Sequence, residues 1–219
     1  MSELFDCSDA QARATGIASA VSAVKGGRLV VLPTDTVYGI GADAFDNTAV
    51  AALLSAKGRG RDMPVPVLVG SWHTIEGLVY SVPNSARELI RAFWPGALSL
   101  VVRQAPSLHW DLGDAAGTVM LRMPLHPVAI EVLREVGPMA VSSANISGRP
   151  AAVTAQVARD QLGDLVGVYL DAGPSERQAA STIVDLTGEH PRILRDGPVT
   201  ADAIAKVLGV DVDSLTEIT

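Results

Sequence analysis

The sequence contains a single cysteine, Cys7, so the chain cannot form an internal disulfide bond. This cysteine usage is typical of a protein from a reducing compartment. The four histidines lie far apart in the sequence and never at the spacing of a pair on one helix face. Together with the lone cysteine, this spacing disfavours a structural zinc site. We expect the N-terminal segment around Cys7 to be mobile.

Aromatic residues make up only 4% of the chain, so valine, leucine, isoleucine and alanine must fill the interior. No apolar run approaches the roughly 20 residues that span a bilayer. The N-terminal segment contains Glu3, Asp6 and Asp9 and lacks the basic-then-apolar layout of a signal peptide. We therefore expect a soluble, cytoplasmic protein with no membrane contact.

The formal net charge is −7, which argues against a chain built mainly to coat nucleic acid, because neutralising phosphates takes many lysines and arginines. The cations are unevenly distributed, however, and Lys57, Arg59 and Arg61 fall within five positions. The overall charge therefore leaves room for a local basic pocket.

Helix and strand periodicities alternate along the 219 residues, with no internal repeat and no low-complexity linker. Three late strands follow one another without helices between them, which favours a mixed sheet over a purely parallel one. We predict one α/β domain over residues 1–219, with flanking helices. The predicted strands are 29–32, 65–69, 98–103, 118–122, 138–141, 166–170, 181–186 and 192–195. One predicted helix ends near residue 25, and the others cover 47–57, 84–94, 127–136, 154–162 and 200–209. Residues 211–219 are expected to be frayed.

The segment 39–44, Gly-Ile-Gly-Ala-Asp-Ala, matches the glycine pattern of a dinucleotide-binding loop. That loop requires a helix directly after the strand and an acidic residue about 20 positions later. Here residues 33–36 follow the strand, the next helix begins near Asn47, and the downstream segment is basic. We interpret Gly39 and Gly41 as residues that permit a tight turn.

Two polar segments are candidates for anion binding. Lys57, Arg59 and Arg61 alternate with glycines after a helix, which is consistent either with charges that complement the helix dipole or with an anion-binding loop. The segment 142–148 places serine and asparagine side chains directly after a predicted strand, where ligands of α/β folds usually lie. Arg122 ends another apolar strand, and Arg195 lies on a late one.

Taken in order, these segments resemble the YrdC-like family of threonylcarbamoyl-AMP synthases over about residues 13–200. The resemblance implies a single domain of the short type, with a strongly twisted mixed sheet around a large concave cavity. It also implies the reaction of L-threonine, bicarbonate and ATP to threonylcarbamoyl-AMP and pyrophosphate, the first step towards threonylcarbamoyl-adenosine in tRNA. The matching segments are 33–41, Lys57-x-Arg59, 93–96, 98–100, Arg122-x-Pro124, His126-Pro127, 143–148, 181–185 and Arg195-x-Gly197.

The resemblance also implies residue roles. Lys57 and Arg59 would be catalytic and, with Thr118, Ser143, Asn145 and Arg195, would bind ATP; Thr34, Arg122 and Ser181 would bind threonine. Members often have Asn, His and Ser where this chain has Met63, Leu68 and Ala151, so no role is carried to those three positions. The protein would act as a nucleotidyltransferase and pass its product to proteins that modify tRNA.

We expect Mg²⁺ to accompany ATP, held mostly by phosphate oxygens and water, with no metal ligand among the side chains. Asp35 is a candidate outer-sphere group. The alternatives are a related protein of the same fold that binds RNA or acts on another small substrate, with direct tRNA contact also open. Carbamoyl transfer in hydrogenase maturation is a third alternative, although this chain lacks the length and the cysteine pairs of those proteins.

Overall fold

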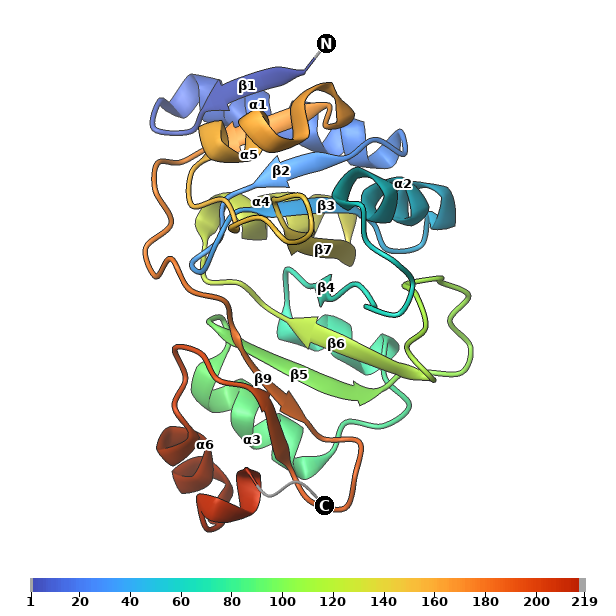
Figure 1. Cartoon of the computed structure of the whole chain (residues 1–219), viewed down its shortest axis with the longest axis vertical. Coiled ribbons are helices and arrows are strands. Elements are labelled where there is room, and N and C mark those ends of the chain that lie inside the picture. The colour runs from blue at the N-terminus through green and yellow to red at the C-terminus, as the bar shows by residue number, and fades with distance from the viewer. Residues whose placement is uncertain (1, 217–219) are drawn as a thin grey trace.

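The computed structural model describes residues 2–216, and its centre is one ten-stranded mixed sheet (Figure 1). The strand order is β1-β8-β2-β3-β7-β4-β6-β5-β9-β10. The strands are β1 (Glu3–Asp6), β2 (Val30–Leu32), β3 (Gly39–Asp43), β4 (Val67–Leu68), β5 (Leu98–Arg103), β6 (Thr118–Arg122), β7 (Met139–Ser143), β8 (Val168–Asp171), β9 (Thr182–Asp185) and β10 (Arg192–Arg195). The helices are α1 (Ala10–Lys25), α2 (Asn47–Lys57), α3 (Asn84–Phe93), α4 (Pro127–Val136), α5 (Ala155–Leu162) and α6 (Ala201–Leu208), with short 3₁₀ helices η1 (Trp72–Gly77), η2 (Gly163–Leu165) and η3 (Asp213–Leu215).

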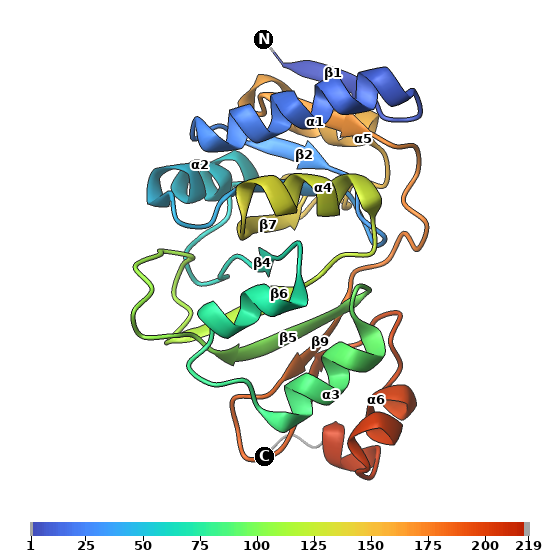
Figure 2. The ribbon, with the colours of Figure 1, turned by 180° about the vertical axis from the view of Figure 1, so that it is seen from behind.

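The sheet is mixed, as the sequence predicts: β8 runs parallel to β1 and β2, β6 to β4, and β9 to β5, whereas the other neighbours are antiparallel. Helices α2 and α5 lie on the side of the sheet that Figure 1 turns to the viewer. Helices α1, α4 and α3 lie on the side that Figure 2 turns to the viewer. The two halves of the sheet meet at β4, which is only two residues long.

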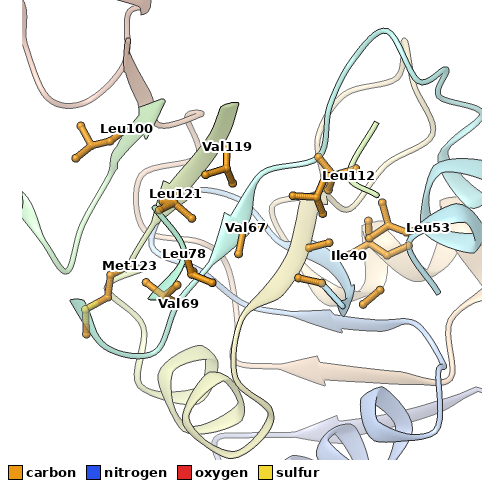
Figure 3. Packing of buried hydrophobic residues seen from close by; sticks show 14 of the residues in the cluster. Ile40, Leu53, Val67, Val69, Leu78, Leu100, Leu112, Val119, Leu121 and Met123 are labelled. Carbon is orange, nitrogen blue, oxygen red and sulfur yellow. The ribbon is translucent and has the colours of Figure 1, made fainter. Parts of the chain in front are cut away.

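The core is aliphatic, as the scarcity of aromatic residues requires. Figure 3 shows Ile40 of β3, Leu53 of α2, Val67 of β4 and Leu121 of β6 in one cluster, and each is at most 2% exposed. The cluster therefore continues across β4 and joins the two halves of the sheet. No helix within residues 2–216 is long and apolar enough to cross a membrane.

Strand β3 corrects the prediction of a glycine turn at 39–41. It pairs antiparallel with both β2 and β7. A Cβ on Gly39 would lie 2.6 Å from Val141 Cγ1, and one on Gly41 would lie 2.8 Å from Met139 Cε. These glycines are thus required by the close approach of side chains from β7. Their weak strand propensity hides the strand in the sequence.

The described segments near the two ends of the chain are more ordered than predicted. Strand β1 pairs with β8, and Cys7 behind it is 8% exposed, so this segment is packed and not mobile. Near the other end, η3 places Leu215 at 0% exposure, which corrects the prediction of fraying for 211–216. Residues 217–219 lie outside the described residues. The few apolar residues in this short polar segment carry little periodic signal, which explains the error.

One helix cap and one strand boundary also differ from the prediction for clear physical reasons. Helix α2 is capped by Asp46, whose carboxylate accepts from the backbone N–H groups of Thr48 and Ala49 at 3.0 Å, and not by Asn47. Strand β4 covers only part of the predicted 65–69. Pro66 explains the shortening, because proline has no N–H to donate to a neighbouring strand.

We expect Gly39→Ala to lower the free energy of unfolding by about 1–3 kcal/mol, because the new methyl group overlaps Val141. Chemical denaturation measures the change. Gly77→Ala is the matched control: nothing lies within 4 Å of a Cβ there, so stability should change by less than about 0.5 kcal/mol. The double variant Gly39→Ala, Val141→Ala should be more stable than the sum of the single effects. Additive effects would contradict the proposed contact.

Candidate active site

A cavity of about 520 Å³ lies where the two halves of the sheet meet. It is lined by residues of strands β3, β4, β5, β6, β7, β9 and β10 and of the loops that follow β2, α2, β7 and β8. Three arginines are among its lining residues, and no carboxylate is. The lining residues are Thr34, Thr36, Val37, Tyr38, Gly39, Arg59, Pro64, Pro66, Leu68, Ser99, Met120, Arg122, Val141, Ser142, Ser143, Pro150, Ala151, Gln178, Ala180, Ser181, Ile183 and Arg195.

Arg122, at the end of β6, is held on three sides although it is almost fully buried. Its Nε donates to the carbonyl of Gly96 at 2.9 Å, and Nη1 donates to Thr36 Oγ1 at 2.8 Å. Nη2 donates to Asp35 Oδ1 at 2.5 Å. A guanidinium has five N–H groups, so each terminal nitrogen keeps one that these bonds do not use. Two such donors match the two oxygens of a carboxylate.

Arg195 and Ser181 form a second polar group. The Nε and Nη2 atoms of Arg195 donate to the Ser181 carbonyl at 2.9 and 2.7 Å, and Nη2 also reaches Ser181 Oγ at 3.1 Å. Ser181 Oγ is 2.8 Å from the hydroxyl of Ser99 on β5. All three residues line the cavity. The Nη1 atom of Arg195 makes no hydrogen bond among the described residues.

Arg59 enters the cavity from the loop after α2. Gly58 adopts a left-handed conformation with φ of 59°, which ends the helix and turns the chain. The Nη1 of Arg59 donates to Ser142 Oγ at 3.0 Å, and Nη2 donates to the Pro64 carbonyl at 3.3 Å, while buried Nε has no partner. Burial lowers the pKa of Arg59, as it does for the other two arginines of the cavity. Because the ordinary pKa of arginine exceeds 12, all three stay charged at neutral pH.

Lys57 lies beneath the loop after β7 and is 2% exposed. Its Nζ donates to the carbonyls of Ser143 at 2.5 Å and Asn145 at 2.8 Å, and to Asn145 Oδ1 at 3.3 Å. The Asn145 amide in turn donates to the carbonyls of Ile146 and Arg149. Burial, with a smaller contribution from Arg59, lowers the pKa of Lys57 to about 8. Lys57 therefore holds both the end of β7, where Ser143 lies, and the start of the loop after it.

Thr34 follows β2 at the rim of the cavity. Its hydroxyl donates to the Val37 carbonyl at 2.6 Å, lies 3.0 Å from Thr36 Oγ1, and accepts from the Thr36 N–H at 3.2 Å. These bonds shape the loop so that both threonines line the cavity.

The structure thus brings most of the predicted site residues together. Thr34, Arg59, Arg122, Ser143, Ser181 and Arg195 line the cavity. Lys57 and Asn145 do not line the cavity, but their hydrogen bonds hold the end of β7 and the loop after it, which contribute lining residues. Thr118 lies outside the lining and donates to the Ala115 carbonyl at 2.7 Å, so its contact with ATP stays a prediction.

The third cation of the basic cluster does not join the cavity. Arg61 is exposed and pairs with Asp111 at 2.8 Å and with Asp114 at 3.3 Å. Of the three positions that depart from the resembled family, Leu68 and Ala151 line the cavity, whereas Met63 is 45% exposed and does not. Asp35 is 1% exposed and is absent from the lining.

Sequence reasoning did not assign several polar residues of the cavity. Ser99 is a single polar residue in the apolar run of β5, and such isolation in a buried strand was a usable signal. Thr36 and Gln178 gave no comparable signal, because polar residues are ordinary in loops. No group of three or more His, Cys, Asp or Glu side chains able to hold a metal occurs among the described residues.

Comparisons with known proteins agree with the family resemblance of the sequence. The Sua5/YciO/YrdC family model, described as "Telomere recombination", matches residues 22–197. A protein of Mycobacterium tuberculosis named putative threonylcarbamoyl-AMP synthase is 79% identical over 215 residues, covering 98% of this chain and 99% of its own.

Solved structures share the fold. Sua5 of P. abyssi complexed with L-threonine has a TM-score of 0.89 and 32% identity, covering 95% of this chain. This chain spans 61% of the length of that Sua5 chain. YciO of E. coli has a TM-score of 0.80 at 22% identity, covering 98% of this chain and 100% of its own, and shows the fold alone.

We expect NMR of protein with ¹³C-labelled lysine to show one side-chain signal that titrates near pH 8, the signal of Lys57. The chain has only three lysines, so Lys57→Arg assigns it. Pyrophosphate should raise this pKa, because a nearby negative charge favours the ammonium form. A Lys57 signal that begins to titrate only above about pH 9.5, close to the ordinary lysine value, would contradict the buried placement.

Proposed function

The chain belongs to the Sua5/YciO/YrdC family, and we propose that it is a threonylcarbamoyl-AMP synthase. It would convert L-threonine, bicarbonate and ATP into threonylcarbamoyl-AMP and pyrophosphate, acting as a nucleotidyltransferase. The observation that carries the proposal is the cavity, in which three charged arginines and several hydroxyl groups face a space without a carboxylate. Such a lining suits a ligand with several negative charges.

The arrangement of donors divides the cavity between two substrates. The two unused N–H groups of Arg122 would take the threonine carboxylate as a bidentate pair, with Thr34 and Ser181 supplying polar contacts nearby. Arg59 and Arg195 would contact the phosphates, and Ser143 would contact the nucleotide. Lys57 would support the nucleotide side through the loop that it holds, and its direct contact with phosphate stays a prediction.

The reaction needs positioning and charge stabilisation but no covalent nucleophile. The threonine amino group and bicarbonate would first condense, forming the N–C bond of a carbamate and releasing water. A carbamate oxygen would then attack the α-phosphorus of ATP, form a mixed anhydride and release pyrophosphate. Negative charge develops on the phosphate oxygens in this step, and Arg59 and Arg195 of the cavity lining would stabilise it.

Mg²⁺ would accompany ATP. Because no carboxylate lines the cavity, the ion would be held by phosphate oxygens and water, which is the usual mode for Mg²⁺ with nucleotides. Bound Mg²⁺ would supply positive charge that offsets part of the triphosphate charge.

The reactivity of the proposed product implies that a partner protein consumes it. A mixed anhydride of a carbamate and a phosphate hydrolyses readily, so a transferase that passes the threonylcarbamoyl group to tRNA would have to consume it directly. Contact of this chain with tRNA itself stays a prediction.

We expect purified protein to release pyrophosphate only when ATP, bicarbonate and L-threonine are all present. A coupled pyrophosphate assay, with chromatographic detection of the adenylate, measures this. Pyrophosphate release that does not depend on threonine would contradict the proposed activity.

We expect Arg59→Ala to lower kcat/KM for ATP at least about tenfold, a loss of about 1.4 kcal/mol, because a phosphate contact is removed. Lys57→Ala should also lower turnover at least about tenfold, since the end of β7, where Ser143 lies, loses its support. Arg61→Ala is the matched control: it removes a cation two residues from Arg59 whose partners lie outside the cavity, and activity should stay within about twofold. Equal losses in Arg59→Ala and Arg61→Ala would point to overall charge and not to this site.

A further inference from the structure

Asp35 lies behind the arginine to which we assign the amino-acid carboxylate. Its carboxylate is 1% exposed, and Oδ1 accepts from Arg122 Nη2 at 2.5 Å and from the Leu125 backbone N–H at 2.9 Å. Arg122 lines the cavity, whereas Asp35 does not. Asp35 therefore acts on the cavity only through the arginine.

The direction of the unused donors on Arg122 depends on this contact. Gly96 and Thr36 hold Nε and Nη1, and Asp35 holds Nη2, so the three acceptors together determine the guanidinium plane. The Leu125 N–H holds the carboxylate in turn. An arginine that is already oriented loses less conformational entropy when it binds a ligand.

Asp35 is also the only carboxylate paired with any of the three cavity arginines among the described residues. Its charge offsets part of the cost of burying Arg122. The second oxygen, Oδ2, has no hydrogen-bond partner, and Arg177 Nε lies 4.0 Å from it. The Arg177 backbone N–H donates to the Asp35 carbonyl at 3.3 Å, so the loop that also carries Gln178 of the cavity rests on this residue.

We propose that Asp35 is a positioning residue for the amino-acid substrate: it orients Arg122 so that two N–H groups point at the substrate carboxylate. The proposal rests on the function proposed above. It replaces the expectation that Asp35 assists Mg²⁺, because Oδ1 already accepts from two donors, Oδ2 is buried, and Asp35 does not line the cavity.

Steady-state kinetics of Asp35→Ala and Asp35→Asn test the proposal. KM for L-threonine should rise at least about tenfold in Asp35→Ala and less in Asp35→Asn, which keeps an acceptor oxygen. KM for ATP and the Mg²⁺ concentration for half-maximal rate should stay within about twofold. The double variant Asp35→Ala, Arg122→Ala should be no worse for threonine than Arg122→Ala alone, because Asp35 acts through the arginine.

Asp111→Asn is the matched control. It removes the carboxylate that pairs with Arg61 outside the cavity, and KM for L-threonine should not change. Equal rises of KM for threonine and ATP in the Asp35 variants would mean a merely structural role and overturn the proposal. A selective rise in the Mg²⁺ requirement would restore the metal assignment and overturn it as well.

NMR of the unaltered protein gives a measurement that does not depend on the variants folding. The Nη signals of Arg122, assigned with Arg122→Lys, should be separate and slowly exchanging before any ligand is added, since three acceptors hold the group. Signals that sharpen only with L-threonine would overturn the proposal. Calorimetry separates the two levels of inference. Unaltered protein that does not bind threonine removes the proposed function, whereas equal affinity in unaltered protein and Asp35→Ala removes the role of Asp35 alone.

Discussion

The structure depends on holding the cations in and around the cavity with neutral acceptors. Arg59 is held by a hydroxyl and a carbonyl, Arg195 by the carbonyl and hydroxyl of Ser181, and Lys57 by carbonyls and an amide oxygen. Such partners fix the geometry without cancelling the charge. The cavity therefore keeps a positive potential in a partly desolvated space, which a polyanionic ligand can satisfy.

Arg122 is the exception, because Asp35 pairs with it directly. The difference matches the two ligands that we assign to the cavity. A triphosphate carries several negative charges and benefits from arginines whose charge is not offset. An amino acid carries one carboxylate, and here the direction of the donors matters more than the total charge. The same cavity thus combines a phosphate site that depends on net positive charge with a carboxylate site that depends on the orientation of its donors.

Short-range patterns made most of the fold predictable. Strands β5, β6 and β10 and helices α4 and α5 lie where apolar periodicity and capping residues placed them. The elements that the sequence failed to predict have a common feature. Each is stabilised by tertiary packing, which local propensity does not reflect. Strand β3 contains glycines that give Val141 and Met139 room, and η3 is held by one buried leucine.

The sequence by itself determined the residue types of the site and their order, because cations, hydroxyls and glycines stand at spacings that resemble one family. Only the tertiary structure decided which of these groups face the cavity. Lys57 and Arg59 are two positions apart, with the turn at Gly58 between them. Arg59 lines the cavity, whereas Lys57 lies under the loop after β7. Asp35 contacts Arg122 across 87 positions of sequence. Contacts of that kind depend on strand order and burial, which no local pattern encodes.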